Sequence, residues 1–196
     1  MTDNPKCLLC NNSENIDVSL GAINCPICGK YQFDPYVENL FTQNEVSDDL
    51  RLKIRYKVKK NHLEQLKKTG INKINRQSLI LTEEAIQNIK NSITVPKMLE
   101  KIELVMDYIE ENTTFISEKI YIDSNKFFPL FFCKNNYELI SILKYLIDSK
   151  LINTSDKLNG KSTEVEIPDV PTRELTDYIY NYYLDSRTKY QDGRLT

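Results

Sequence analysis

Between residues 48 and 68, apolar and basic positions alternate in a way that two secondary structures can explain. Residues 51–60 alternate almost one by one, which is typical of a strand with one exposed side. A helix is favoured instead, because Ser47 is a good N-cap residue, acidic residues follow it, and apolar residues then recur at four-residue steps. We therefore predict one helix over residues 48–68, ended by Gly70.

Four more helices and three strands are predicted by periodicity and by capping residues. Thr82 and Asn135 are candidate N-caps, and Pro96 opens a helix with one apolar stripe. The predicted helices cover residues 82–92, 96–110, 135–150 and 173–187, and the strands cover 30–33, 119–122 and 163–167. The stripe of the helix after Pro96 comprises Leu99, Ile102, Val105, Met106 and Ile109.

Composition narrows the class of protein. The chain has 196 residues, of which 40% are hydrophobic and 28% charged, which is typical of a folded globular protein. The start has no apolar run, and the longest apolar stretch, residues 127–133, is too short to span a bilayer. We therefore expect a soluble, cytoplasmic chain with no membrane partner. A single histidine, His62, and five glycines exclude histidine-rich zinc sites and the usual glycine-rich phosphate loops, so we expect no enzyme.

Four of the five cysteines lie in two CxxC pairs near the N-terminus. Cys7 and Cys10 form the first pair, Cys25 and Cys28 the second, and 14 residues separate the pairs. Two such turns can direct four thiolates at one point, which is the closed tetrahedral shell of structural Zn²⁺. Gly29 directly follows the last ligand and can adopt the positive φ that such a turn requires.

Three other interpretations of the cysteines stay open at this stage. Iron of the rubredoxin type uses the same four ligands, so the spacing does not distinguish it from zinc. Disulfides need an oxidising compartment, against which the missing signal sequence argues. A redox CxxC normally occurs as one pair beside a βαβ unit, which the sequence does not predict. The fifth cysteine, Cys133, follows an aromatic run and is predicted to be a buried apolar residue.

Two segments resemble known folds. The two cysteine pairs with the strand Lys30–Phe33 resemble a rubredoxin-like zinc ribbon, over about 35 residues. The order of elements after Pro96, with the helix and strand entry of residues 138–152, resembles a winged helix. Together they resemble a loose group of uncharacterised bacterial proteins in which such a region often precedes an effector domain linked to phage defence. This chain contains no such domain, and we carry over no activity.

Charge is unevenly distributed along the chain. The net charge is −2, but residues 51–76 hold 10 basic residues and one acidic residue, whereas residues 1–50 hold two basic and eight acidic residues. A helix this basic can contact nucleic-acid phosphates, but a run of charge is more usually a solvated face that pairs with the protein's own acids. The predicted helix over 135–150 has no arginine or glutamine to read a base edge. His62, beside these basic residues, is predicted to lie on the surface.

These observations predict a mainly α (α+β) fold of three parts. A zinc ribbon covers residues 1–35, a helical connector with the basic helix covers 36–95, and a winged-helix-like domain with a C-terminal helix covers 96–196. We expect a non-enzymatic zinc-binding module that contacts nucleic-acid phosphates, or alternatively a protein–protein adaptor or assembly subunit in which the basic segment is neutralised internally. The candidate phosphate-binding residues are Arg51, Lys53, Arg55, Lys57, Lys59, Lys60, Lys67 and Lys68.

Overall fold

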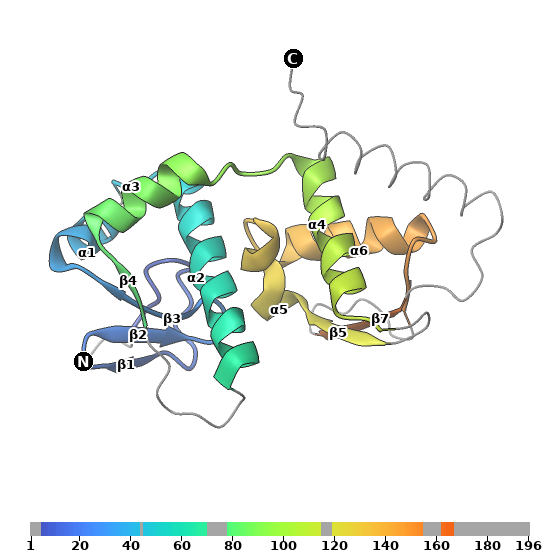
Figure 1. The fold of residues 1–196 in the computed structure, drawn as a ribbon, viewed down its shortest axis with the longest axis horizontal. Coiled ribbons are helices and arrows are strands. Elements are labelled where there is room, and N and C mark those ends of the chain that lie inside the picture. The colour runs from blue at the N-terminus through green and yellow to red at the C-terminus, as the bar shows by residue number, and fades with distance from the viewer. Residues whose placement is uncertain (1–4, 44, 70–77, 115–118, 155–161, 167–196) are drawn as a thin grey trace, which may run out of the picture.

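Helices and short strands form two groups, one on each side of the long helix α2 (Asp48–Thr69) (Figure 1). The structure is a computed structural model that describes residues 5–43, 45–69, 78–114, 119–154 and 162–166. Within these residues the fold is mixed α and β. Its N-terminal cysteine cluster, on short antiparallel strands, is compatible with a zinc-ribbon-like start.

The first group is built on a small sheet, whose strands in spatial order are β1 (Asp17–Ser19), β2 (Ala22–Cys25), β3 (Gly29–Phe33) and β4 (Leu79–Leu81). The first three strands are antiparallel, whereas β4 pairs in parallel with β3, so that Tyr31 lies beside Leu79 and Phe33 beside Leu81. Successive strand residues point to opposite faces, and Tyr31 and Phe33 therefore share the buried face. The sheet thus depends on a strand that follows β3 by more than 40 residues.

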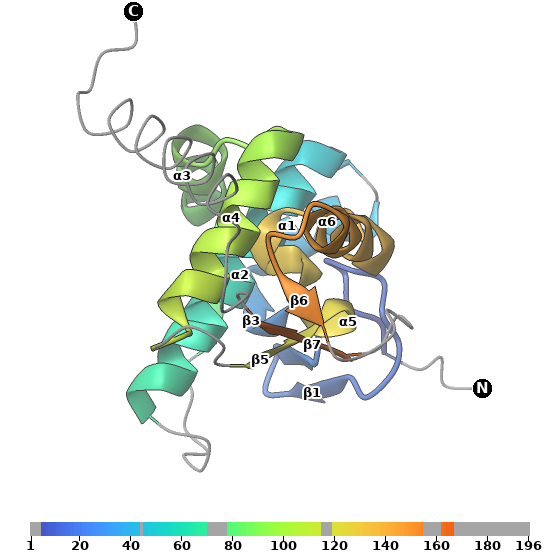
Figure 2. The ribbon, with the colours of Figure 1, turned by 90° about the vertical axis from the view of Figure 1, so that its right-hand side faces the viewer.

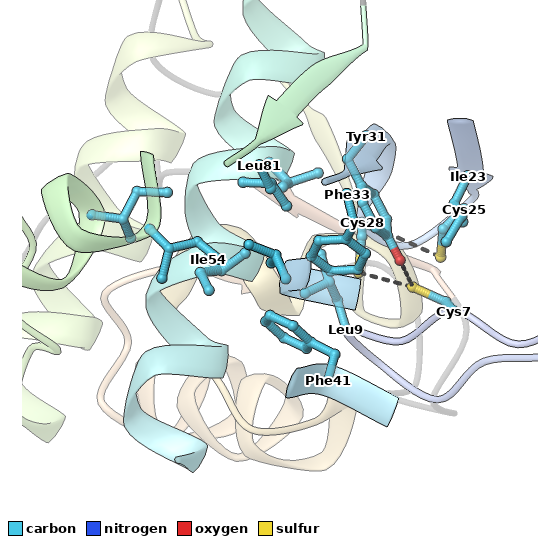
Figure 3. Close-up of a cluster of buried hydrophobic side chains, with 14 residues drawn as sticks. Cys7, Leu9, Ile23, Cys25, Cys28, Tyr31, Phe33, Phe41, Ile54 and Leu81 are labelled. Carbon is cyan, nitrogen blue, oxygen red and sulfur yellow. Dashed lines mark hydrogen bonds between the residues drawn. The ribbon is translucent and has the colours of Figure 1, made fainter. Parts of the chain in front are cut away.

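Three helices pack with this sheet: α1 (Pro35–Thr42), α2, and α3 (Glu83–Ser92). Asp34 caps α1 by accepting a hydrogen bond from the Tyr36 amide, and Thr82 caps α3 by accepting one from the Ala85 amide. One buried core joins the cysteine turns, the sheet and the helices (Figure 3). Its members outside the cysteines include Leu9, Tyr31, Phe33, Phe41, Ile54 and Leu81.

The second group follows in the order α4 (Met98–Glu111), β5 (Ile120–Asp123), α5 (Ser124–Phe127), the 3₁₀ helix η1 (Phe128–Phe131), α6 (Asn136–Asp148), β6 (Asn153–Thr154) and β7 (Ser162–Glu166). Its strands form an antiparallel sheet in the order β5-β7-β6, with α4 and α6 packed nearby (Figure 2). Asn135 caps α6 by accepting a hydrogen bond from the Glu138 amide. A second buried core, centred on Leu139, Leu143 and Leu146, holds this group together.

The predicted apolar stripe of α4 is partly wrong. Val105 and Ile109 are buried as expected, but Leu99 is 63% exposed. The buried residue of this first turn is Lys101, whose ammonium forms an ion pair of 2.6 Å with Glu138 on α6. A charged pair therefore joins α4 to α6 where an apolar contact was expected.

Most predicted elements are confirmed. Residues 48–69 form a helix, and the three predicted strands begin within one residue of their expected positions. Cys133 is buried, as predicted. The predicted helix over 173–187 lies outside the described residues. No helix in the described part of the chain combines the length and the hydropathy that crossing a membrane requires.

Candidate metal centre

The four N-terminal cysteines come from two tight turns. Cys7 and Cys10 belong to a turn that is closed by two backbone hydrogen bonds of 2.8 Å, from the Cys7 amide to the Asn12 carbonyl and from the Asn11 amide to the Cys7 carbonyl. Cys25 ends β2, and Cys28 directly precedes β3. The antiparallel pairing of β2 with β3 therefore holds the second pair of sulfurs at one end of the sheet. We call these turns the first and the second cysteine turn.

The four sulfur atoms lie close together. The Sγ atoms of Cys7 and Cys28 are 3.9 Å apart, those of Cys10 and Cys25 are 3.6 Å apart, and all four lie within 4.8 Å of one another. A tetrahedral ion with metal–sulfur bonds of about 2.3 Å would place its ligands about 3.8 Å apart. The predicted ligand set therefore fits a tetrahedral thiolate site, and all four ligands come from protein.

Backbone geometry at each turn supports this arrangement. Gly29 has a φ of +102°, as the sequence predicts, and Asn11, the residue after Cys10, has a φ of 59°. The Cys28 amide lies 3.4 Å from the Cys25 sulfur and donates toward it. Amides that point at ligand sulfurs stabilise thiolate charge and fix the orientation of the ligands.

Burial and mutual contact shift the pKa values of the four thiols in different directions. Cys7, Cys25 and Cys28 are buried, and Cys10 is partly buried. Hydrogen bonds from the other thiols, that of Cys10 first, lower the pKa of Cys7, whereas the contact with Cys25 raises the pKa of Cys10. Four adjacent thiols cannot all carry charge unless a cation lies among them, so full deprotonation of this group requires a metal ion.

Tyr31 contacts the cysteine group, and the sequence analysis did not predict this contact. Its side chain is fully buried, and its hydroxyl oxygen lies 3.1 Å from the Cys7 sulfur (Figure 3). Burial first, and then the charge of Cys7, raise the pKa of Tyr31, so its hydroxyl keeps its proton and can donate to a thiolate. The available signal was its position three residues after Cys28 on a strand whose alternate side chains are buried.

The eight candidate phosphate-binding residues fall into three classes of exposure. Arg55 and Lys59 are buried, Arg51 and Lys53 are partly buried, and the other four are exposed, namely Lys57, Lys60, Lys67 and Lys68. Lys53 forms an ion pair of 3.1 Å with Asp49. The structure therefore does not place the eight on one open face.

Helix α2 approaches the second cysteine turn very closely at His62. A Cβ atom added to Gly29 would lie 2.6 Å from the Cβ of His62. His62 is partly buried by this contact, although the sequence predicted a surface residue. Glycine at position 29 thus allows both the positive φ of the turn and the close approach of α2.

A metal ion held by these four side chains would have no position for a substrate or an activated water, which is typical of a structural site. Among the described residues, no second group of histidine, cysteine and acidic side chains has metal-binding geometry. Comparisons with protein-family models, curated proteins and solved structures find no match to this chain. The functional argument therefore rests on the residues themselves.

Proposed function

We propose that the chain is a non-enzymatic binding module whose four N-terminal cysteines hold one structural Zn²⁺. Support comes from the sulfur–sulfur distances of 3.6 and 3.9 Å and from the amide that points at the Cys25 sulfur. Fe²⁺ or Fe³⁺ would accept the same ligands. Metal analysis of the purified protein distinguishes them, and we expect one zinc per chain, lost in Cys25→Ser.

We further propose that the module contacts nucleic-acid phosphates through α2. The observation that carries this proposal is the separation of the helix's cations into an inward and an outward set. Lys57, Lys60, Lys67 and Lys68 are exposed, and the only acidic residue between positions 50 and 69 is Glu64. This outward set, which we call the lysine face, provides a positive surface that requires no base sequence for binding.

Residues 98–166 support a winged-helix interpretation of the second group. The described elements follow the order helix, strand, two short helices, helix, strand, strand. This order and the sheet order β5-β7-β6 are similar to those of a winged helix. In that interpretation α6 occupies the place of the recognition helix. Its exposed side chains include Tyr137, Lys144 and Tyr145 but no arginine or glutamine, so we propose phosphate contacts without direct base readout.

A protein adaptor is the second candidate function, and the exposed tyrosines of α6 favour it. Tyr137 is 73% exposed and Tyr145 is 52% exposed. They are eight residues apart and therefore share one helix face. Tyrosine is enriched at protein interfaces, where its ring packs and its hydroxyl stays hydrogen bonded.

Binding of the metal-loaded protein to labelled duplex DNA, single-stranded DNA and RNA tests the two functions. If the four residues of the lysine face each neutralise one phosphate, the slope of log K against log salt for duplex DNA is about −3.6, and binding weakens about 150-fold between 50 and 200 mM salt. Lys57→Glu with Lys60→Glu should at least halve this slope. The matched control, Lys90→Glu with Lys97→Glu, changes two exposed lysines outside α2 and should bind as the wild type does.

Either of two results would reject phosphate binding by α2. Absence of binding at 50 mM salt would favour the adaptor, as would an oligomer or a stable complex that Tyr137→Ala with Tyr145→Ala disrupts. Binding that the Lys57 and Lys60 charge reversals leave unchanged would place the contact elsewhere on the molecule.

A further inference from the structure

Four side chains lie along the side of α2 that contacts the cysteine turns. Arg51, Arg55, Lys59 and His62 are spaced by four, four and three residues, which places them on one side of a helix. We call them the inner stripe. None of them belongs to the lysine face, and their contacts within the protein indicate a different role.

The two ends of the inner stripe contact the two cysteine turns. The Arg51 guanidinium donates a hydrogen bond to the carbonyl of Leu8, inside the first turn, and lies over the Phe41 ring at 5.2 Å. His62 lies against Gly29, directly after the second turn. The helix therefore runs across both turns, with Arg55 and Lys59 between the two contacts.

The middle of the inner stripe is buried against the aromatic segment Phe127–Cys133. Arg55 is 7% exposed and Lys59 is 4% exposed. Burial lowers the pKa of Lys59 to about 8, whereas the charges of Cys28 and Cys25 act in the opposite direction. Burial likewise lowers the pKa of Arg55, against the charges of Cys28 and Cys10. Both cations therefore lie within electrostatic reach of the ligand sulfurs.

The same two cations also hold the aromatic segment. Arg55 donates hydrogen bonds of 3.1 Å to the carbonyls of Cys133 and Lys134, and its guanidinium lies 5.3 Å from the centre of the Phe128 ring. The Lys59 ammonium lies 5.4 Å from the centre of the Phe127 ring. Each cation thus contacts the aromatic segment, and each lies on the side of α2 from which Arg51 and His62 contact the cysteine turns.

Charge balance gives this arrangement a consequence. A divalent ion with four thiolates carries a net charge of −2, and a buried charge is costly unless an opposite charge compensates it. Arg55 and Lys59 are two buried cations on the side of α2 that contacts both cysteine turns. Conversely, a metal–thiolate complex supplies the negative charge that makes the burial of both cations favourable.

We propose that Arg55 and Lys59 are positioning residues of the metal centre, which retain the metal and couple its binding to the docking of residues 127–133 on α2. The proposal rests on the metal site of the proposed function. It predicts that loss of the metal loosens the packing of residues 127–133 in the second core, although all four ligands precede residue 29.

The test compares metal release and hydrogen exchange in matched variants. Arg55→Met and Lys59→Met remove the inner cations, whereas Lys57→Met and Lys68→Met remove exposed lysines of the same helix. Residues that support metal ligands typically change affinity 10- to 100-fold. We expect the inner variants to release zinc to a chelating dye about 10- to 100-fold faster than the wild type, and the control variants within about twofold of it.

Hydrogen exchange measures the docking of the aromatic segment. The Phe132 and Cys133 amides donate to the carbonyls of Pro129 and Phe128, so their protection reports whether the segment is folded. We expect removal of zinc from the full chain to accelerate their exchange more than that of α4 amides. Arg55→Lys, which keeps the charge without the paired carbonyl contacts, should retain zinc but lose protection there, and it remains informative if Arg55→Met fails to fold.

Two results would overturn the inference alone. The first is zinc release from both inner variants at the rate of the controls, and the second is unchanged exchange in residues 127–133 after zinc removal. If the wild type instead takes up no metal at all, the proposed metal site is itself wrong and this inference falls with it.

Discussion

Replacing Gly29 by alanine should damage the metal centre through two separate effects. The first is backbone strain, because Gly29 has a φ of +102°, a value that residues with a Cβ rarely adopt. The second is a steric clash, because the new Cβ would lie 2.6 Å from the Cβ of His62 and 2.7 Å from its Cγ. A contact this short forces the helix and the second cysteine turn apart.

The magnitude follows from adding the two effects. A residue with a Cβ in a left-handed conformation costs about 1–2 kcal/mol. Overpacking in a region that cannot relax costs about 1–3 kcal/mol more. We therefore expect Gly29→Ala to lower the free energy of unfolding by about 2–5 kcal/mol, measured by urea denaturation of the zinc-loaded protein.

Gly21→Ala is the matched control. Gly21 also has a positive φ, of +76°, but its nearest neighbour is the end of the Gln32 side chain, 3.3 Å away, which can move. Gly21→Ala should therefore show the backbone strain without the clash, a loss of about 1–2 kcal/mol. If Gly29→Ala costs no more than Gly21→Ala, the close approach of α2 to the second cysteine turn does not constrain the fold.

A second substitution separates the two effects. His62→Ala should rescue Gly29→Ala only in part, because it removes the contact with Cγ but retains the Cβ that causes the closest contact. His62→Gly should recover the steric part, apart from the cost of about 1 kcal/mol for a glycine inside a helix. Equal rescue by both His62 substitutions would refute this account of the clash.

Two further predictions concern the second core. Burial raises the pKa of Glu138, but hydrogen bonds from the Lys101 ammonium and the Lys134 amide outweigh it and lower that pKa. The ionised carboxylate should therefore stabilise the fold at pH values above its unfolded pKa, and this contribution should disappear as the pH falls through the lowered folded pKa. Urea denaturation of wild type and Glu138→Gln from pH 7 to pH 3 checks the sign, which would be wrong if the difference grew in acid. Burial raises the pKa of Cys133 to about 12. Iodoacetamide at pH 8 should therefore not modify this thiol in the zinc-loaded protein until denaturant is added. Mass spectrometry detects the modification, and labelling of Cys133 in the native protein would contradict its burial.

Elements with local signals were predictable from the sequence. The grouping of the four cysteines follows from their spacing. The helix starts at Thr82 and Asn135 follow from side chains that accept hydrogen bonds from amides three residues later. For residues 51–60, alternation favoured a strand, but the capping residue and the length of the segment correctly favoured a helix. These signals depend on residues close together in the chain, so they can be recognised without knowledge of the tertiary fold.

Features that depend on distant partners were not predictable. The pairing of β4 with β3 joins residues 79–81 to residues 31–33, and no local pattern specifies that contact. The inward orientation of Arg55 depends on carbonyls almost 80 residues later. Lys101 is buried only because Glu138 lies opposite it, so an apolar-stripe argument placed Leu99 in the core in its stead.

The parallel strand β4 has a consequence for the order in which the molecule forms on the ribosome. All four cysteines emerge within the first 28 residues, but the residues that complete their core, Ile54, Val58, Leu81, Ile86 and Ile89, emerge much later. During synthesis all four cysteines are therefore present before most of the residues that bury them have been made. Nascent chains exposed to oxidants or competing metals in that interval are open to damage from which the finished protein is shielded.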